Sequence, residues 1–219
     1  MSNLNRWAMG VALAAFMAFA PYLFYRYTLE HTKRLRPVVE GRVYRSGCLT
    51  ADGFRDAITK HKIKTVITLW DEEPDPSLPV DRFTWRTIKE SELCKELGVD
   101  FHFVYVILKD DADLKDGRMP AIEKFLKIMD DEASYPVLFH CKAGLHRTGV
   151  MAAIYRMEYE GYSRAEAMRE LRANGFGNFA ANRSNPYIRQ YVLTYQPRTR
   201  VAPARAVEAR PVMLTRPEL

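Results

Sequence analysis

The feature that most limits how this chain folds is an uncharged stretch of nineteen residues near the N-terminus, from Trp7 to Tyr25. At about 1.5 Å per residue, a helix of this length covers the roughly 30 Å hydrocarbon core of a bilayer. Aromatic residues gather at both ends of the stretch, which is typical of the interface between lipid and water. The sequence therefore predicts one N-terminal transmembrane helix that precedes the folded body.

An alternative for this stretch is a cleaved secretory signal, because Ala18-Phe19-Ala20 resembles a small-x-small cleavage site. The apolar run continues beyond that point, and Pro21 would directly follow the cut, so an anchor is favoured. A helix in a soluble core is a third alternative.

Basic residues are more frequent after the stretch than before it: Arg26, Lys33, Arg34 and Arg36 follow it, and Arg6 precedes it. The positive-inside rule then predicts a single-pass membrane protein whose body faces the cytoplasm.

The charge distribution divides the chain into three parts. The net charge is +6 overall, with a surplus of four over residues 1–36 (five basic, one acidic) and of three over 197–219 (five basic, two acidic). Residues 37–196 hold the remaining 23 basic and 24 acidic residues, so a broad nucleic-acid footprint on the body is excluded. We expect a membrane anchor with a flexible juxtamembrane segment over 1–36, a folded domain over 37–196 and a disordered basic tail over 197–219. Three cysteines exclude a disulfide scaffold.

Runs of β-branched and aromatic residues alternate with segments of helical periodicity in the body. The pattern predicts strands at 41–45, 65–69, 101–107 and 136–139, and a loop at 71–81. It predicts helices that begin after a capping Thr50, at 88–97, over the face from Ala121 to Met129, from Val150 onward, and at about 163–173 and 186–195. This alternation is typical of an α/β fold with a central sheet flanked by helices.

The segment after the last strand carries the chemistry and reads His140-Cys-Lys-Ala-Gly-Leu-His-Arg-Thr-Gly149. The backbone N–H groups of such a loop, with the positive end of a helix that starts near Thr148, form a cradle for an anion. Gly144 permits the tight curl, and the planar guanidinium of Arg147 matches two phosphate oxygens. The same field favours the thiolate of Cys141, which is placed to attack phosphorus.

This His-Cys-x5-Arg-Thr-Gly segment resembles the signature loop of the protein tyrosine phosphatase superfamily, in its dual-specificity-like branch of compact bacterial members. The resemblance begins at about Val43-Tyr-Arg-Ser-Gly47, continues through Tyr155-Arg-Met and Ala165-Glu-Ala, and reaches Glu170. It implies a mostly parallel central sheet flanked by helices, the cysteine-phosphatase fold, and a reaction without metal or cofactor.

The resemblance also implies roles for the residues of the loop. Cys141 would be the nucleophile and Arg147 the phosphate clamp, while Thr148 would steady the thiolate and His140 would orient the loop. The residues expected to bind the substrate are Lys142, Ala143, Gly144, Leu145, His146 and Arg147. His140 could instead be a packed core histidine, and Lys142 and His146 could be exposed loop residues without a role.

The family takes its general acid from an aspartate about 30 residues before the cysteine. Asp110, Asp111 and Asp113 lie 31, 30 and 28 residues before Cys141. Asp110 is favoured as the general acid, with Asp111 and Asp113 as alternatives. The non-functional interpretation is that all three belong to a solvated acidic loop. The acid would protonate the leaving group and then, as a carboxylate, activate water against phosphocysteine.

The leading hypothesis is a cysteine-dependent phosphatase that hydrolyses phosphotyrosine or phosphoserine/threonine proteins. Phosphoinositides or inositol phosphates are alternative substrates, because Lys142 and His146 make the loop more basic than phosphotyrosine requires. A pseudophosphatase that holds phosphorylated ligands without turnover, and a rhodanese-like sulfur transferase, are the rival classes. Cys48 and Cys94 are expected to be inert, and a disulfide between Cys141 and either of them is an alternative hypothesis.

Overall fold

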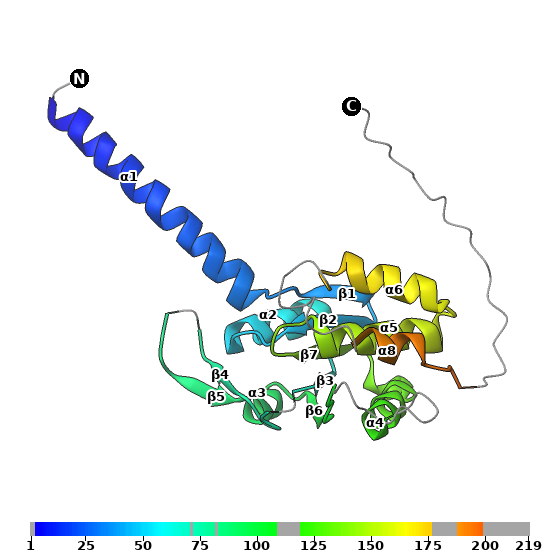
Figure 1. The fold of residues 1–219 in the computed structure, drawn as a ribbon. Coiled ribbons are helices and arrows are strands. Elements are labelled where there is room, and N and C mark those ends of the chain that lie inside the picture. Colours follow the sequence, from blue (N-terminus) through cyan, green and yellow to red (C-terminus); the bar gives the residue numbers. More distant parts are fainter. Residues whose placement is uncertain (1–2, 71, 82, 109–118, 177–187, 199–219) are drawn as a thin grey trace, which may run out of the picture.

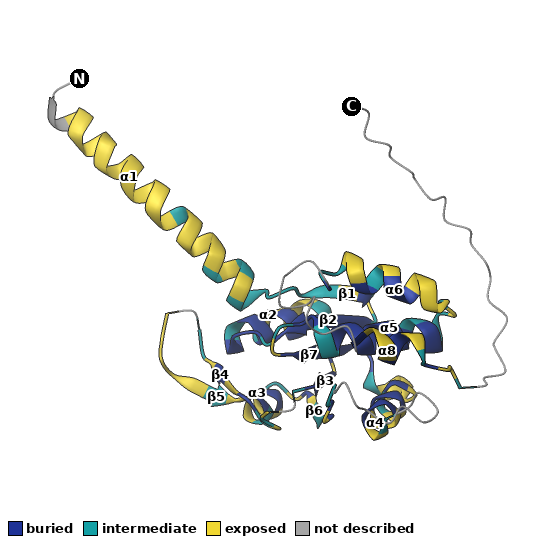
Figure 2. Cartoon of the chain, viewed as in Figure 1, coloured by how far each residue is buried: buried dark blue, intermediate teal, exposed yellow. Residues whose placement is uncertain are grey.

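A computed structural model of the 219-residue chain describes residues 3–70, 72–81, 83–108, 119–176 and 188–198. The long helix α1 (Asn3–Arg26) and a short π-helical turn, η1 (Tyr27–His31), lead into an α/β body (Figure 1). The large apolar side chains of α1 are exposed, and Figure 2 shows the helix open to its surroundings along its length. The segment Asn5–His31 is long and apolar enough to cross a membrane.

The body is built on a sheet of five strands in the order β1-β2-β7-β3-β6. These are β1 (Arg36–Val39), β2 (Val43–Gly47), β7 (Val137–Cys141), β3 (Thr65–Thr68) and β6 (Asp100–Phe103). The edge strand β1 runs antiparallel to its neighbour, whereas β2, β7, β3 and β6 are parallel. The prediction of a mostly parallel central sheet is therefore confirmed.

Helices cover both faces of the sheet. Successive strand residues point to opposite faces, and since both sets are apolar here, each face is buried under a layer of helices. Val66 and Leu138 join the cluster beneath α2 (Ala51–His61) and α3 (Glu90–Glu96). Ile67 and Phe139 join the larger cluster beneath the helices of the opposite layer. Those helices are α4 (Pro120–Met129), α5 (His146–Tyr159), α6 (Arg164–Ala173) and α8 (Ile188–Leu193).

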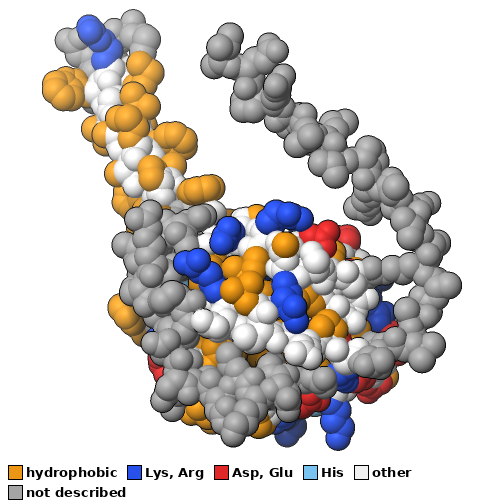
Figure 3. Space-filling view, turned by 45° about the vertical axis from the view of Figure 1, so that its right-hand side comes forward, with side chains coloured by type: hydrophobic (Ala, Val, Ile, Leu, Met, Phe, Trp, Pro, Cys, Tyr) orange, Lys and Arg blue, Asp and Glu red, His pale blue; other side chains and the backbone are white. Residues whose placement is uncertain are grey.

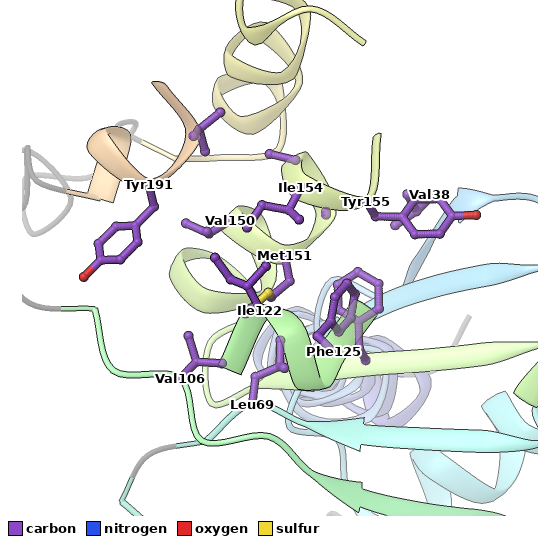
Figure 4. Close-up of a cluster of buried hydrophobic side chains, with 14 of the residues drawn as sticks. Val38, Leu69, Val106, Ile122, Phe125, Val150, Met151, Ile154, Tyr155 and Tyr191 are labelled. Atoms are coloured by element: carbon purple, nitrogen blue, oxygen red, sulfur yellow. The ribbon is translucent and has the colours of Figure 1, made fainter. Parts of the chain in front are cut away.

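Helix α5 occupies the centre of the larger cluster. Figure 4 shows its residues Val150, Met151 and Ile154 gathered with Ile122 and Phe125 of α4. Most of the helix is buried on all sides, so its position relative to β7 is fixed by packing rather than by a single contact. The loop that joins β7 to α5 is therefore held at both ends by the core.

Several predicted boundaries are wrong for identifiable reasons. The expected loop at 71–81 contains β4 (Ser77–Pro79), which pairs with β5 (Thr87–Lys89) in a hairpin, and α3 begins at Glu90 rather than Ile88. The expected strand 101–107 ends at Phe103, yet Val104 and Val106 stay fully buried. Their apolar pattern reflects burial in the core and not pairing in the sheet.

The start of the body also differs from the prediction. Strand β1 was not anticipated, and β2 spans 43–47 instead of 41–45, because Gly41 lies in the turn between them with a φ of 72°. Helix α2 begins as predicted after Thr50, whose side chain accepts a hydrogen bond from the Gly53 N–H.

The juxtamembrane segment is packed against the body, in contrast to the flexible segment that we expected. The Thr50 N–H donates to the carbonyl of Glu30 (3.2 Å), and the Gly47 N–H donates to that of Lys33 (2.8 Å). The ring of His31 lies 2.9 Å from the carboxylate of Asp56 on α2. The end of the apolar helix is therefore fixed to the sheet and to α2 by direct hydrogen bonds.

The far end of the body extends into the expected tail. The Arg198 side chain donates to Glu158 (2.6 Å) and to both carboxylate oxygens of Asp130 (2.8 and 2.9 Å). Burial alone would raise the pKa of Glu158, whose side chain is fully buried, but hydrogen bonds from Tyr195 and Arg198 outweigh it and lower the pKa. The rest of the expected tail, 199–219, lies outside the described residues.

We expect Arg198→Ala to destabilise the fold by about 2–3 kcal/mol at neutral pH, because it leaves the buried Glu158 carboxylate without its cation. The difference in free energy of unfolding between the variant and the unmodified chain should become smaller in acid. The stabilisation from a carboxyl with a lowered pKa is lost as the pH falls through that pKa. Arg55→Ala is a matched control, because the ion pairs of Arg55 are exposed and worth less than about 1 kcal/mol. Urea unfolding measures both, and equal effects would contradict the assignment.

Candidate active site

The candidate site lies at the carboxyl end of the central strand. Cys141 is the last residue of β7, where it pairs in register with Gly47 at the end of β2. Ligands of parallel α/β sheets bind outside the carboxyl ends of the strands, and the neighbouring β2 and β3 end at the same edge. The topology thus places the loop 142–145 at the position where such a sheet accepts a ligand.

Four consecutive carbonyl groups of this loop are bound from outside. The carbonyl of Lys142 accepts from the Cys48 N–H (3.3 Å), and that of Leu145 accepts from the Gly149 N–H (2.9 Å). The two between them accept from guanidinium groups: Arg34 donates to Ala143 (2.9 Å) and Arg45 donates to Gly144 (3.1 Å).

This arrangement determines where the N–H groups of the loop point. Because each peptide unit is planar, a carbonyl that is turned outward turns the next N–H group inward. The Gly144 N–H accordingly donates to the sulfur of Cys141 (3.3 Å). The loop therefore directs the positive end of this amide dipole toward the sulfur.

Gly144 is required by its backbone conformation and by its neighbours. Its φ is 71°, and a Cβ added there would lie 2.5 Å from the backbone nitrogen of Gly47 and 2.7 Å from the carbonyl of Ser46. No side chain fits at such distances, so the loop lies directly against the end of β2.

Helix α5 begins at His146, two residues before the predicted start near Thr148 and four before Val150. The helix starts this early because the Leu145 carbonyl already accepts the Gly149 N–H. Arg147 therefore lies in the first helical turn, where the N–H groups have no partner within the helix and the helix dipole is positive.

The loop and the helix start enclose a cavity of about 220 Å³. It is lined by Leu108, Cys141, Lys142, Ala143, His146, Arg147 and Ile188. The predicted cysteine and arginine thus face the same cavity, together with three of the residues expected to bind substrate.

Comparison with known proteins agrees with this geometry. A family model described as "DSP-PTPase phosphatase fused to NAD+ Kinase" matches residues 28–186. The chain belongs to the dual-specificity-type protein tyrosine phosphatases. This excludes the rhodanese-like alternative, and the loop 140–149 is the signature loop of that phosphatase family.

Individual relatives support the family and the fold. A stretch of 74 residues is 45% identical to the dual specificity protein phosphatase TpbA of Pseudomonas aeruginosa, and it covers 33% of this chain and 33% of that relative. The crystal structure of P. aeruginosa TpbA superposes with a TM-score of 0.56 at 21% identity, over 77% of this chain and 89% of that one. The catalytic core of the PP-IP phosphatase SIW14 from S. cerevisiae gives 0.55 at 21%, over 75% and 86%.

The remaining predicted residues of the signature loop have distinct surroundings. Leu145 is buried, and the ring of His146 contacts Phe176 edge-on. Lys142 is exposed, lies over the ring of Trp70 and pairs with Glu72 at 3.4 Å. The Lys142 side chain thus lines the cavity and also forms an ion pair with Glu72.

Thr148 is fully buried, and its hydroxyl has no hydrogen-bond partner among the described residues. The expected role of Thr148 in steadying the thiolate therefore stays a prediction. Asp110, Asp111 and Asp113 lie outside the described residues. Leu108, two positions before Asp110, is one of the residues that line the cavity.

His140 has a buried acidic partner that the sequence did not reveal. Its Nε2 lies 2.6 Å from the carboxylate of Glu90 at the start of α3, and both side chains are fully buried. The pair joins β7, one residue before Cys141, to the opposite helical layer. Glu90 lies in the first turn of α3, where acidic residues are common, so the sequence shows no sign of its role. That role follows from its contact with His140, 50 positions away in the chain.

Arg34 and Arg45 were also missed as residues that hold the signature loop. Arg45 is 2% exposed, and its burial, with the nearby charge of Arg36, lowers the pKa of its guanidinium to about 10. A buried cation beside the loop adds to the positive field that the loop amides create. Arg45 belongs to the segment on which the family resemblance rests, which is the one signal that could have drawn attention to it.

The two other cysteines have the environment of inert thiols. Burial raises the pKa of Cys48 to about 12, with a further contribution from Glu90, and raises that of Cys94 to about 12 in the same way. Both therefore remain protonated at neutral pH and are poor nucleophiles. All three cysteines are free, so a disulfide with Cys141 stays a prediction.

We expect Gly144→Ala to lower kcat/KM for a phosphoryl substrate by at least about 100-fold, since displacing the loop by even 1 Å misplaces the reacting groups. Gly98→Ala is a matched control, because Gly98 has a φ of 67° and open space around its Cα. Both variants carry the strain of a positive φ, but only Gly144→Ala lies in the signature loop and places a Cβ against the end of β2. A Gly98→Ala variant as impaired as Gly144→Ala would show that strain alone is responsible.

Proposed function

We propose that this chain is a cysteine-dependent phosphatase that hydrolyses phosphomonoesters through a phosphocysteine intermediate. The observation that carries the proposal is the shared cavity of Cys141 and Arg147, above a loop whose carbonyl groups are all bound from outside. Such a cavity offers a nucleophile, a bidentate cation and inward N–H dipoles to one phosphate group.

In the first step, the thiolate of Cys141 attacks phosphorus opposite the ester oxygen. The S–P bond forms as the P–O bond to the leaving group breaks, while Arg147 and the amides of residues 142–147 stabilise the charge on the non-bridging oxygens. The leaving oxygen takes a proton from Asp110, with Asp111 and Asp113 as alternative donors.

In the second step, the resulting carboxylate removes a proton from water. The water attacks phosphorus, the S–P bond breaks, and Cys141 returns as a thiolate while inorganic phosphate leaves. The pair of Glu90 and His140 is placed to hold the end of β7 during both steps, because it fixes the residue that precedes the nucleophile.

We further propose that α1 anchors the phosphatase in a membrane and that the body faces the cytoplasm. Apolar side chains are exposed on all sides of α1, including Trp7, Val11, Phe16 and Phe19, and Figure 3 shows hydrophobic side chains on the visible face of its middle part. A helix that lies on a membrane surface has a polar face, so this distribution favours a spanning helix. The excess of basic residues after the helix supports the orientation.

Cys141→Ser should abolish turnover of para-nitrophenyl phosphate, by at least about 1,000-fold, because a serine hydroxyl is not ionised in this field. The variant should still bind vanadate or phosphate, since the amides and Arg147 remain. Cys48→Ser should keep full activity and serves as the control. An active Cys141→Ser variant would refute the thiolate mechanism, and an unmodified chain that binds phosphate without turnover would be a pseudophosphatase.

Asp110→Asn should slow hydrolysis of an alkyl phosphate about 100-fold, and that of para-nitrophenyl phosphate much less, because a good leaving group needs no proton. The dependence of kcat on the pKa of the leaving group measures this directly. If Asp111→Asn or Asp113→Asn gives the steep dependence instead, the general acid is reassigned to that residue.

Inositol phosphates are a second candidate substrate class. Lys142 and His146 line the cavity beside Arg147, so a ligand with several phosphate groups meets cations beyond the clamp. The structural relative SIW14 of S. cerevisiae is a PP-IP phosphatase. We expect Lys142→Ala to raise KM for an inositol polyphosphate about ten-fold, and KM for a phosphotyrosine peptide less than about two-fold. Equal changes for both substrates would remove this candidate.

A further inference from the structure

The β4–β5 hairpin carries an exposed aromatic pair. Trp85 is 100% exposed and Phe83 is 65% exposed, whereas Leu78 at the base of the same hairpin is fully buried in the core. Exposed hydrophobic residues that lie together on a surface, unlike single scattered ones, mark contact with a membrane or another protein. We call Phe83, Thr84 and Trp85 the hairpin tip.

The base of the hairpin is fixed to the body, so the tip has a defined position. The Lys89 ammonium pairs with the carboxylate of Glu73 (2.9 Å), and Asp75 accepts from both the N–H (2.9 Å) and the hydroxyl (2.8 Å) of Ser91 on α3. The side chain of Asp81 also accepts from the Thr84 N–H (2.8 Å). These contacts hold the turn that presents the two aromatic rings.

The tip lies beside the end of the apolar helix. One cavity of about 360 Å³ is lined by Arg26 and Glu30 of the helical segment and by Thr84 and Trp85 of the tip. Figure 1 likewise shows the hairpin on the side of the body from which α1 emerges. Arg26 is the first charged residue after the uncharged stretch, so the tip lies level with the expected lipid–water boundary.

The position of the tip relative to α1 is rigid. The carbonyls of Glu30 and Lys33 accept backbone N–H groups of Thr50 and Gly47, and the ring of His31 contacts Asp56. A helix that is joined to the body in this way cannot enter a bilayer without bringing the tip to its surface.

The chemistry of the tip fits that surface. Tryptophan favours the headgroup region, where its ring meets acyl chains and its N–H meets water. Arg26, Lys33 and Lys142 line the same cavity as Trp85, together with Glu30 and Asp81. Arg26 pairs with Glu30 (2.8 Å) and Lys142 with Glu72 (3.4 Å), so the aromatic rings, and not an excess of positive charge, carry the fit to the membrane interface.

We propose that Phe83 and Trp85 form a second membrane contact, in the interface of the bilayer that α1 crosses. The inference rests on the membrane anchor of the proposed function. Two contacts, one spanning and one interfacial, fix the tilt and rotation of the body. Lys142 lines both this cavity and the cavity of Cys141, so the candidate active site is the neighbour of the cavity that adjoins the tip.

Fluorescence of Trp85 in the full-length chain tests the proposal. The chain has three tryptophans, so Trp7→Phe and Trp70→Phe leave Trp85 as the only indole. The protein is reconstituted in vesicles of phosphatidylcholine and phosphatidylglycerol, with or without bromine near the start of the acyl chains. We expect brominated lipid to reduce the emission about two-fold and the membrane to shield the indole from acrylamide, as for an interfacial ring.

The matched control places an indole on the body away from α1. Leu193 of α8 is 48% exposed, so Leu193→Trp, combined with Phe at positions 7, 70 and 85, should respond to acrylamide and not to bromine. If Trp85 behaves as this control does while the chain resists carbonate extraction, the tip contact is wrong and the anchor stands. If carbonate releases the chain, both are wrong. Turnover of para-nitrophenyl phosphate reports on the phosphatase chemistry separately.

Discussion

The structure of the site depends on the hydrogen-bond donors that bind the carbonyl groups of residues 142–145. The carbonyl groups of residues 142–145 are all bound: two by the guanidinium groups of Arg34 and Arg45, one by the Cys48 N–H, and one by the Gly149 N–H in the first turn of α5. Buried carbonyl groups need donors, and the donors found here leave the Gly144 N–H free to point at the Cys141 sulfur. The orientation of the loop amides around Cys141 thus depends in part on Arg34 and Arg45, which do not line the cavity of about 220 Å³.

The sheet supplies the frame for these donors. Arg45 comes from β2 and Cys141 from the adjacent β7, and the register of the two strands brings Gly47 beside Cys141. On the opposite face, the buried pair of Glu90 and His140 ties β7 to α3. The central strand is therefore connected to both helical layers close to its last residue, where positional precision matters most for chemistry.

The sequence predicted what depends on local pattern. The strands with two buried faces, the cap at Thr50 and the loop from His140 to Gly149 follow from residues that lie next to one another in the chain. The hairpin was missed because β4 and β5 have only three residues each, too few for a recognisable alternation. Arg34, Arg45 and Glu90 were missed because their partners lie 109, 99 and 50 positions away, and no periodicity reports contacts at such separations.

Arg34 links two parts of the molecule that are commonly treated as separable. It has a φ of 61°, an unusual conformation for a residue with a side chain, and its guanidinium reaches the carbonyl of Ala143. A soluble fragment trimmed to begin at residue 37 would lose this support together with the first residue of β1. A cut at residue 37 would thus alter the very loop whose reactivity is to be assayed, whereas a fragment that lacks the hydrophobic stretch but keeps Arg34 would retain this contact.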